Sequence, residues 1–165
     1  MIRIGVRLAA LLICAGAAMT SARAETPLER GKYLATIMDC GGCHTTGSLV
    51  GHPDPAKYLA GSDIGWLIPN LGVFYPANIT PDKATGIGAW GDEDIVKALR
   101  TGVRPDGRDL APMMPWRAYA ALSAGDMEAL VAFLRSVPAV EHAVAGPTGL
   151  DAVKTPYITV AVPAK

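Results

Sequence analysis

The sequence predicts a single, mainly α-helical domain, and three observations lead to that prediction. Segments with helix start signals and apolar 3.6-residue periodicity lie near both ends of residues 25–140, and a third lies between them. Long stretches rich in Gly, Pro and Asn separate these segments and show no sustained period. A Cys-x-x-Cys-His pentapeptide directly follows the first helical segment. A length of 165 residues is also typical of one domain.

Residues 1–24 have the pattern of a signal peptide. Arg3 and Arg7 form a positive beginning, residues 8–19 are apolar, and Ala22-Arg23-Ala24 is a small-x-small cleavage site. The apolar run is shorter than the roughly 17 to 25 residues that span a bilayer, although an uncleaved anchor is the alternative. We therefore expect export to the periplasm, with cleavage near Ala24.

The pentapeptide Cys40-Gly41-Gly42-Cys43-His44 is typical of covalent attachment of c-type haem. Two thiols on one helical turn can each bond a haem vinyl group, and the adjacent imidazole then becomes an iron ligand. We interpret Gly41 and Gly42 as leaving the porphyrin edge unobstructed. The pattern does not recur, so the sequence predicts one haem per chain.

The first helix begins after Thr26, which forms a capping box with Glu29, and Pro27 occupies its first position. Gly31 inside this helix costs about 1 kcal/mol relative to Ala. That cost is offset if another helix crosses closely there, and the alternative is a tolerated surface glycine.

A middle helix is predicted over residues 92–101, with an acidic first turn and Gly102 as its stop. The last helix begins at Ser123, where Asp126 completes a sequence resembling a capping box, and ends before Pro138. We expect the first and last helices to pack against each other.

The loops are expected to wrap the cofactor. Residues 66–68 and 71–75 predict a small β-hairpin, and residues 141–165 predict an irregular tail along the surface. Four aromatic side chains are candidates to line the cofactor or to pack ordinarily: Trp66, Phe74, Tyr75 and Trp90.

Met113 and Met114 lie between Pro112 and Pro115, in a stretch unsuited to a helix or strand. A thioether binds haem iron well and raises its reduction potential. A stiff loop would hold such a sulfur in place. The alternative is that both side chains are apolar filler.

Several motifs together resemble class I cytochrome c, and the chain is similar to the cytochrome c domains of bacterial periplasmic alcohol, gluconate and sorbitol dehydrogenases. The resemblance covers about residues 28–140. Besides the haem motif it rests on Arg30-Gly31-x-Tyr33-Leu34-Ala35, Asn78-Ile79-Thr80-Pro81-Asp82, Thr85-Gly86-Ile87-Gly88-x-Trp90, Met114-Pro115-Trp116 and Leu130-Val131-Ala132-Phe133-Leu134-Arg135.

The resemblance implies a class I cytochrome c fold with crossing terminal helices and long haem-wrapping loops. It implies His44 and Met114 as iron ligands, with Met113 as the second choice, and Trp90 near a haem propionate. It also implies a one-electron carrier rather than an enzyme. The expected donor is a periplasmic dehydrogenase, and the acceptor is an oxidase or another cytochrome. The relatives often carry three haem domains in tandem and a membrane-associating tail, whereas this chain has one such domain and a polar-ended tail. We therefore expect membrane contact only through partners.

The 15 basic and 15 acidic residues balance, so the charge gives no indication of nucleic-acid binding. Four basic residues fall in one short segment, which predicts either a rim that steers an acidic partner or an ordinary solvated face: Lys97, Arg100, Arg104 and Arg108.

Four other interpretations remain open. A loosely bound Met114 would give a haem enzyme or gas sensor with an open iron. His52 or His142 could replace Met114 opposite His44, or could complete a zinc site with the two cysteines. A redox dithiol needs a strand before the cysteines, where the sequence predicts a helix.

Overall fold

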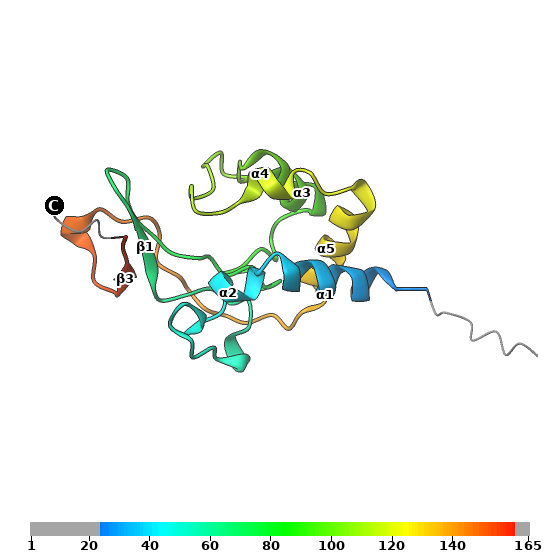
Figure 1. Ribbon diagram of the computed structural model, residues 1–165, viewed down its shortest axis with the longest axis horizontal. Helices are drawn as coiled ribbons and strands as arrows, with labels where there is room; N and C mark the ends of the chain where they lie inside the picture. Colours follow the sequence, from blue (N-terminus) through cyan, green and yellow to red (C-terminus); the bar gives the residue numbers. More distant parts are fainter. Residues whose placement is uncertain (1–23, 161–165) are drawn as a thin grey trace, which may run out of the picture.

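The computed structural model describes residues 24–160, so the predicted signal peptide lies outside the described residues except for Ala24. Within them the chain is mainly helical, as predicted, with a small sheet (Figure 1). The α-helices are α1 (Pro27–Ile37), α2 (Cys40–His44), α3 (Asp92–Thr101), α4 (Trp116–Tyr119) and α5 (Ala124–Ser136). The strands are β1 (Gly65–Ile68), β2 (Gly72–Phe74) and β3 (Tyr157–Ile158), and short 3-10 turns are η1 (Ser48–Val50), η2 (Pro55–Lys57) and η3 (Leu150–Ala152).

Helix α1 begins as predicted. The Thr26 hydroxyl accepts a hydrogen bond from the Glu29 backbone N–H at 3.2 Å, and the Glu29 carboxylate accepts one from the Thr26 N–H at 2.8 Å. Pro27 is at the first helical position, where a missing N–H costs nothing. The capping box thus satisfies donors that would otherwise have no partner at the helix start.

Helices α1 and α5 lie against each other, and Gly31 is the point of closest approach (Figure 1). A Cβ on Gly31 would overlap the backbone carbonyl of Ala129 and would lie 2.7 Å from the Cβ of Phe133. Gly31 is also buried. Of the two interpretations of this glycine, the close helix crossing is therefore correct.

The capping box predicted for α5 forms only in part. The Ser123 hydroxyl accepts a hydrogen bond from the Asp126 N–H at 3.1 Å, as a cap should. The Asp126 carboxylate instead accepts from Arg30 Nε at 2.7 Å and so connects α5 to α1. A charged partner on the neighbouring helix offers a stronger bond than the cap N–H.

The predicted hairpin is present, and the tail adds a strand to it. Strands β1 and β2 pair antiparallel, and β3 pairs parallel with the other edge of β1. Thr148 forms a further bridge with Val73. The tail is therefore less irregular than predicted, because its backbone supplies partners for edge groups of the hairpin.

The core lies between α1, α3 and α5. Its buried side chains include Leu34, Ile95, Leu99, Met127, Leu130, Phe133 and Leu134, whereas Leu59 and Ile87 are the loop contributions. Between residues 24 and 160 no helix has the length and apolar character needed to cross a membrane.

Candidate haem-binding site

The Cys-x-x-Cys-His pentapeptide forms the single turn of α2, so both thiols lie on one helical turn, as predicted. Both cysteines are free. Asp39 precedes them in the left-handed region, with φ 54°. A Cβ on Gly42 would overlap the Asp39 carboxylate, and one on Gly41 would lie 3.0 Å from the Tyr58 ring. The glycines therefore make room for Asp39 and Tyr58. That they also leave the porphyrin edge unobstructed stays a prediction.

His44 is held by a hydrogen bond of its Nδ1 to the backbone carbonyl of Ala77, with the two atoms 2.7 Å apart. Because a carbonyl only accepts, Nδ1 carries the proton, and Nε2 of the neutral ring keeps its lone pair. Burial lowers the pKa of His44, although the Ala77 bond raises it in part. The ring therefore has the tautomer that a metal-binding histidine needs.

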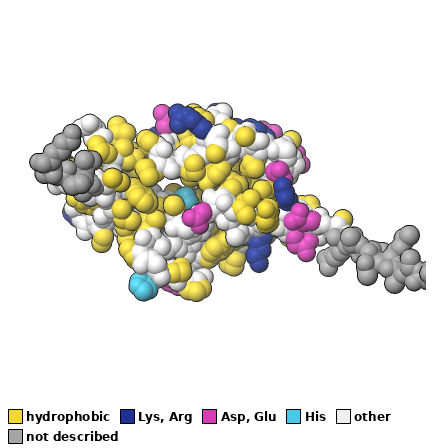
Figure 2. All heavy atoms as spheres, in the orientation of Figure 1, with side chains coloured by type: hydrophobic (Ala, Val, Ile, Leu, Met, Phe, Trp, Pro, Cys, Tyr) yellow, Lys and Arg dark blue, Asp and Glu magenta, His cyan; other side chains and the backbone are white. Residues whose placement is uncertain are grey.

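A cavity of about 520 Å³ separates α2 from the loop that carries the two methionines. Figure 2 shows hydrophobic side chains around a hollow near the middle of this face of the molecule. The volume is in the range of ligand and cofactor sites. The walls include every residue predicted for the site and all four candidate aromatics: Cys40, Cys43, His44, Trp66, Phe74, Tyr75, Trp90, Met113 and Met114.

The methionine loop is fixed at both of its ends. Gly102 has φ 75°, and the Trp116 indole occupies the space that a Cβ on Gly102 would fill. The Met114 N–H donates to the Ala111 carbonyl at 2.8 Å. Met114 packs against the core, whereas Met113 is 52% exposed. Both side chains reach the cavity, but Met114 is the better shielded sulfur.

Trp90 is positioned by Arg135, a residue that sequence analysis identified only as part of a family motif. Arg135 donates to the backbone carbonyls of Ile87, at 3.0 Å, and Trp90, and its Nε lies 2.9 Å from Asp92 Oδ1. These bonds attach the loop that carries Trp90 to α5. Arginine's several fixed donors allow it to hold two carbonyls and a carboxylate at once.

Arg104 lies at the cavity wall with an unused donor. Its guanidinium is 5.4 Å from the centre of the Trp90 ring. Among residues 24–160, its Nε is buried and has no hydrogen-bond partner, and the closest carboxylate oxygen, of Asp106, is 3.5 Å away. A buried unpaired donor is costly, so this position suits an acceptor on a bound group. Together with the free imidazole nitrogen and the thiol pair, it fits a haem with its propionates.

Three of the four residues predicted for the basic rim bind other groups of the chain. Arg100 donates to the carbonyls of Ala120, at 3.0 Å, and Leu122, at 3.3 Å, and so stabilises the end of α4. Arg104 and Arg108 both pair with Asp106. Arg100 therefore has a structural role, and a rim that steers an acidic partner stays a prediction.

The other interpretations of the cysteines find little support in this geometry. No group of three His, Cys, Asp or Glu side chains suited to a metal occurs in the described part of the chain. Neither His52 nor His142 lines the cavity. Burial raises the pKa of the Cys40 thiol to about 11 and raises that of Cys43, so neither is a reactive thiolate near neutral pH.

Comparison with known proteins supports the interpretation of this cavity as a haem site. The cytochrome c family matches residues 28–138, which is most of the chain. The chain belongs to the cytochrome c family. The class I fold expectation is thereby supported, and membership implies covalent haem c and electron transfer.

The relatives of this cytochrome include three dehydrogenase subunits. It is 42% identical to the cytochrome c subunit of alcohol dehydrogenase (quinone) from Gluconobacter oxydans (strain 621H) over 118 residues, which are 72% of this chain and 23% of that subunit. It is 42% identical to the fructose dehydrogenase cytochrome subunit of Gluconobacter japonicus over 117 residues, 70% of this chain and 22% of the relative. It is 41% identical to the gluconate 2-dehydrogenase cytochrome c subunit of Pantoea cypripedii over 117 residues, 70% of this chain and 24% of the relative.

The chain thus spans about a quarter of the length of these relatives. The family resemblance predicted from the motifs is confirmed, including its connection to dehydrogenase cytochrome subunits.

Proposed function

We propose that this cytochrome is a one-electron carrier with a single haem c bonded to Cys40 and Cys43 and ligated by His44 and Met114. One observation carries the proposal. The two thiols, the imidazole and the thioether, from segments about 70 residues apart, line the same apolar cavity. A haem needs these groups in one place, and ordinary core packing does not.

When bound, the haem supplies an iron that changes between the ferric and ferrous states. The protein contributes the surroundings of that change. The Ala77 carbonyl orients the His44 ring, and most of the cavity wall is apolar. A thioether ligand favours a high reduction potential. Two strong protein ligands leave no position for a substrate, so we assign no enzymatic step to this chain.

Trp90 and Arg104 complete the site at one wall. An indole N–H and an unpaired guanidinium N–H are both donors, and haem propionates are acceptors. The contact between Arg104 and the Trp90 ring keeps the two donors together. We therefore assign them to the propionate edge of the haem.

The proposed electron donor is a dehydrogenase, and the proposed acceptor is an oxidase or another cytochrome. The support for the donor is that three relatives are named as dehydrogenase cytochrome subunits. The positive beginning, apolar run and small-x-small site of residues 1–24 support export to the periplasm, where c-type haem is attached. Contact with the membrane would then come through the partners.

Expression in a host that matures c-type cytochromes tests the proposal. We expect a red protein whose pigment stays on the chain in acidified acetone, with one haem per chain. The oxidised protein should show a sulfur-to-iron charge-transfer band. Met114→Ala should abolish that band, and the matched variant Met113→Ala should retain it.

Three results would contradict the proposal. They are a colourless protein, pigment released by acid, or rapid carbon monoxide binding by the unmodified chain. The last result would favour the haem enzyme or gas sensor with an open iron.

A further inference from the structure

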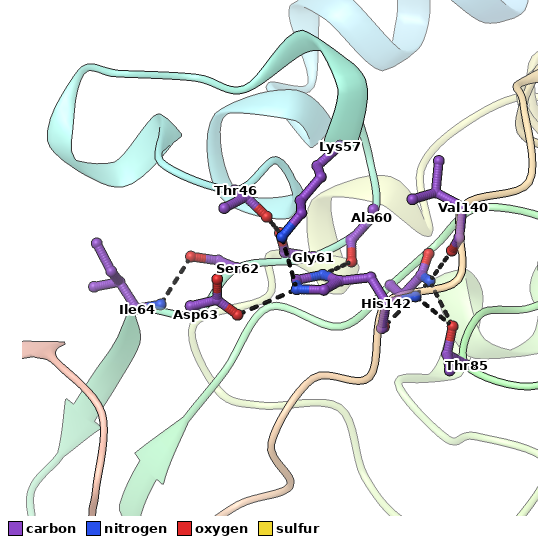
Figure 3. A network of polar contacts seen from close by, with 11 residues as sticks. Thr46, Lys57, Ala60, Gly61, Ser62, Asp63, Ile64, Thr85, Val140 and His142 are labelled. Carbon is purple, nitrogen blue, oxygen red and sulfur yellow. Dashed lines mark hydrogen bonds and ion pairs between the residues drawn. The ribbon is translucent and has the colours of Figure 1, made fainter.

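Residues 140–142, which we call the tail segment, follow the part of the chain that matches the family and lie against the loop that carries Ala77. Figure 3 shows His142 among residues of three separate loops. Ala77 matters because its carbonyl accepts the proton on His44 Nδ1.

The backbone of the tail segment is bonded to buried side chains of this loop. Asn78, next to Ala77, donates its amide to the carbonyls of Val140 at 2.8 Å and His142 at 3.4 Å. The Val140 N–H donates to the Thr80 hydroxyl at 3.2 Å, and the His142 N–H donates to the Thr85 hydroxyl at 2.9 Å. Asn78 is 3% exposed and Thr80 is fully buried, so water does not replace these partners easily.

The His142 side chain connects the tail segment to the other side of His44. Its Nδ1 lies 2.9 Å from the Ala60 carbonyl, and its Nε2 lies between Lys57 Nζ, at 3.5 Å, and Asp63 Oδ1, at 3.3 Å (Figure 3). The next residue, Gly61, donates its N–H to the backbone carbonyl of His44 at 2.7 Å. The two loops that donate to or accept from His44, at Gly61 and Ala77, are thus both bonded to the tail segment.

We propose that the tail segment positions the haem-ligating histidine: His142 and the backbone of residues 140–142 hold Ala77 at the distance at which it accepts the His44 Nδ1 proton. The inference rests on the proposed function, since it assigns His44 to the iron. His142 is a positioning residue, and it acts through Ala60 and Asn78.

The expected consequence concerns the reduction potential. A hydrogen bond from Nδ1 makes the imidazole a stronger electron donor, which favours ferric iron. If the tail segment loosens, the Ala77 bond weakens, ferric iron is less favoured, and the potential rises.

Three single variants of the haem-loaded protein test this inference. His142→Ala removes the bond to Ala60 and should raise the midpoint potential. It should also increase solvent exchange of the His44 Nδ1 proton, followed by NMR, about tenfold, as expected for the loss of one buried hydrogen bond. His142→Asn keeps an N–H donor near the position of Nδ1 and should restore both values. Ala143→Ser changes an exposed neighbour and should leave both unchanged.

The unmodified protein offers a measurement that does not depend on a variant folding. If the tail segment holds Ala77, the His142 amide and the His44 Nδ1 proton should exchange with the same opening free energy. Independent exchange would overturn the inference, as would a His142→Ala protein that is less stable but has an unchanged potential and an unchanged His44 proton. Failure of the proposed function is distinguishable, because the unmodified chain would then carry no covalent haem.

Discussion

The two sides of this molecule are built differently. On one side, α1 and α5 pack without a gap, and Gly31 brings the two backbones into contact. On the other side, loop residues between 66 and 90 and between 104 and 115 line a cavity, and Ile95 and Leu99 of α3 and Leu130 and Leu134 of α5 form part of its wall. The α1–α5 crossing is closed by protein alone, whereas the loop side leaves a space that a bound group would fill.

This difference in construction explains why the sequence patterns of the two sides differ. Regular periodicity and capping sequences mark the helix side, because helices bury a repeating stripe. Gly, Pro and Asn mark the cavity side, because the chain there follows the outline of a ligand. Residues 45–91 contain only two short strands and two 3-10 turns. So long a segment with little regular structure is unusual in a domain with only a protein core, and the proposed haem would account for it.

Loss of the proposed haem should have the largest effect on hydrogen exchange, and it should affect the cavity side more than the helix side. We expect Cys40→Ser combined with Cys43→Ser to release the pigment to acidified acetone. Backbone amides of the cavity loops should then exchange about a hundredfold faster, as expected when a tightly bound ligand is lost. Hydrogen-exchange mass spectrometry would measure this, and α1 and α5 should change less. Equal increases on both sides would contradict the comparison.

Gly31→Ala should instead destabilise the packing of α1 against α5. The new methyl group would overlap the Ala129 carbonyl, and backbone cannot move aside as a flexible side chain can. We expect the free energy of unfolding in denaturant to fall by about 3 kcal/mol.

Gly125→Ala is the matched control, since nothing lies within 4 Å of a Cβ at that position in α5. This control should raise the free energy of unfolding by about 0.5–1 kcal/mol. A neutral Gly31→Ala would mean that the crossing is looser than described.

Arg100→Ala tests whether this arginine belongs to a basic rim or to the structure. Because Arg100 donates to two carbonyls at the end of α4, we expect the free energy of unfolding to fall by about 1–3 kcal/mol. Lys97→Ala, at an exposed position one turn away, should change it by less than about 0.5 kcal/mol. Each variant removes one positive charge, so both should change the salt dependence of the electron-transfer rate, measured by stopped flow, by the same amount. A larger change in Arg100→Ala would support a basic rim that includes Arg100.

The smallest expected effect is a change with pH at the edge of the helix crossing. The hydrogen bond from Arg30 holds the pKa of Asp126 below its ordinary value of 3.8. The folded state therefore binds this proton less readily than the unfolded state, and the stabilisation present above pH 3.8 is lost as the pH falls below it. Asp126→Asn should flatten acid unfolding followed by circular dichroism, whereas Glu128→Gln on the exposed face of α5 should not. If Asp126→Asn unfolded in acid at the same pH and with the same slope as the unmodified protein, the Arg30–Asp126 pair would contribute no pH dependence.

Much of this fold was predictable from local sequence. The bounds of α3 agree with the prediction, because an acidic first turn and Gly102 mark its two ends. The hairpin was predictable from two apolar runs around Pro69-Asn70. Helix α4 and strand β3 were not predicted, since four and two residues are too few for a periodic pattern.

The sequence alone determined the family and the haem-attachment motif, because Cys40, Cys43 and His44 lie within five residues and their spacing is local. The tertiary structure decided which distant groups meet them: the Ala77 carbonyl at His44, Met114 across the cavity, and Arg104 at its wall, whose Nε has no hydrogen-bond partner among the described residues. It also decided that the tail is bonded to Asn78. The physical reason is that a backbone carbonyl has no sequence signature, and contacts between distant segments depend on how the whole chain packs.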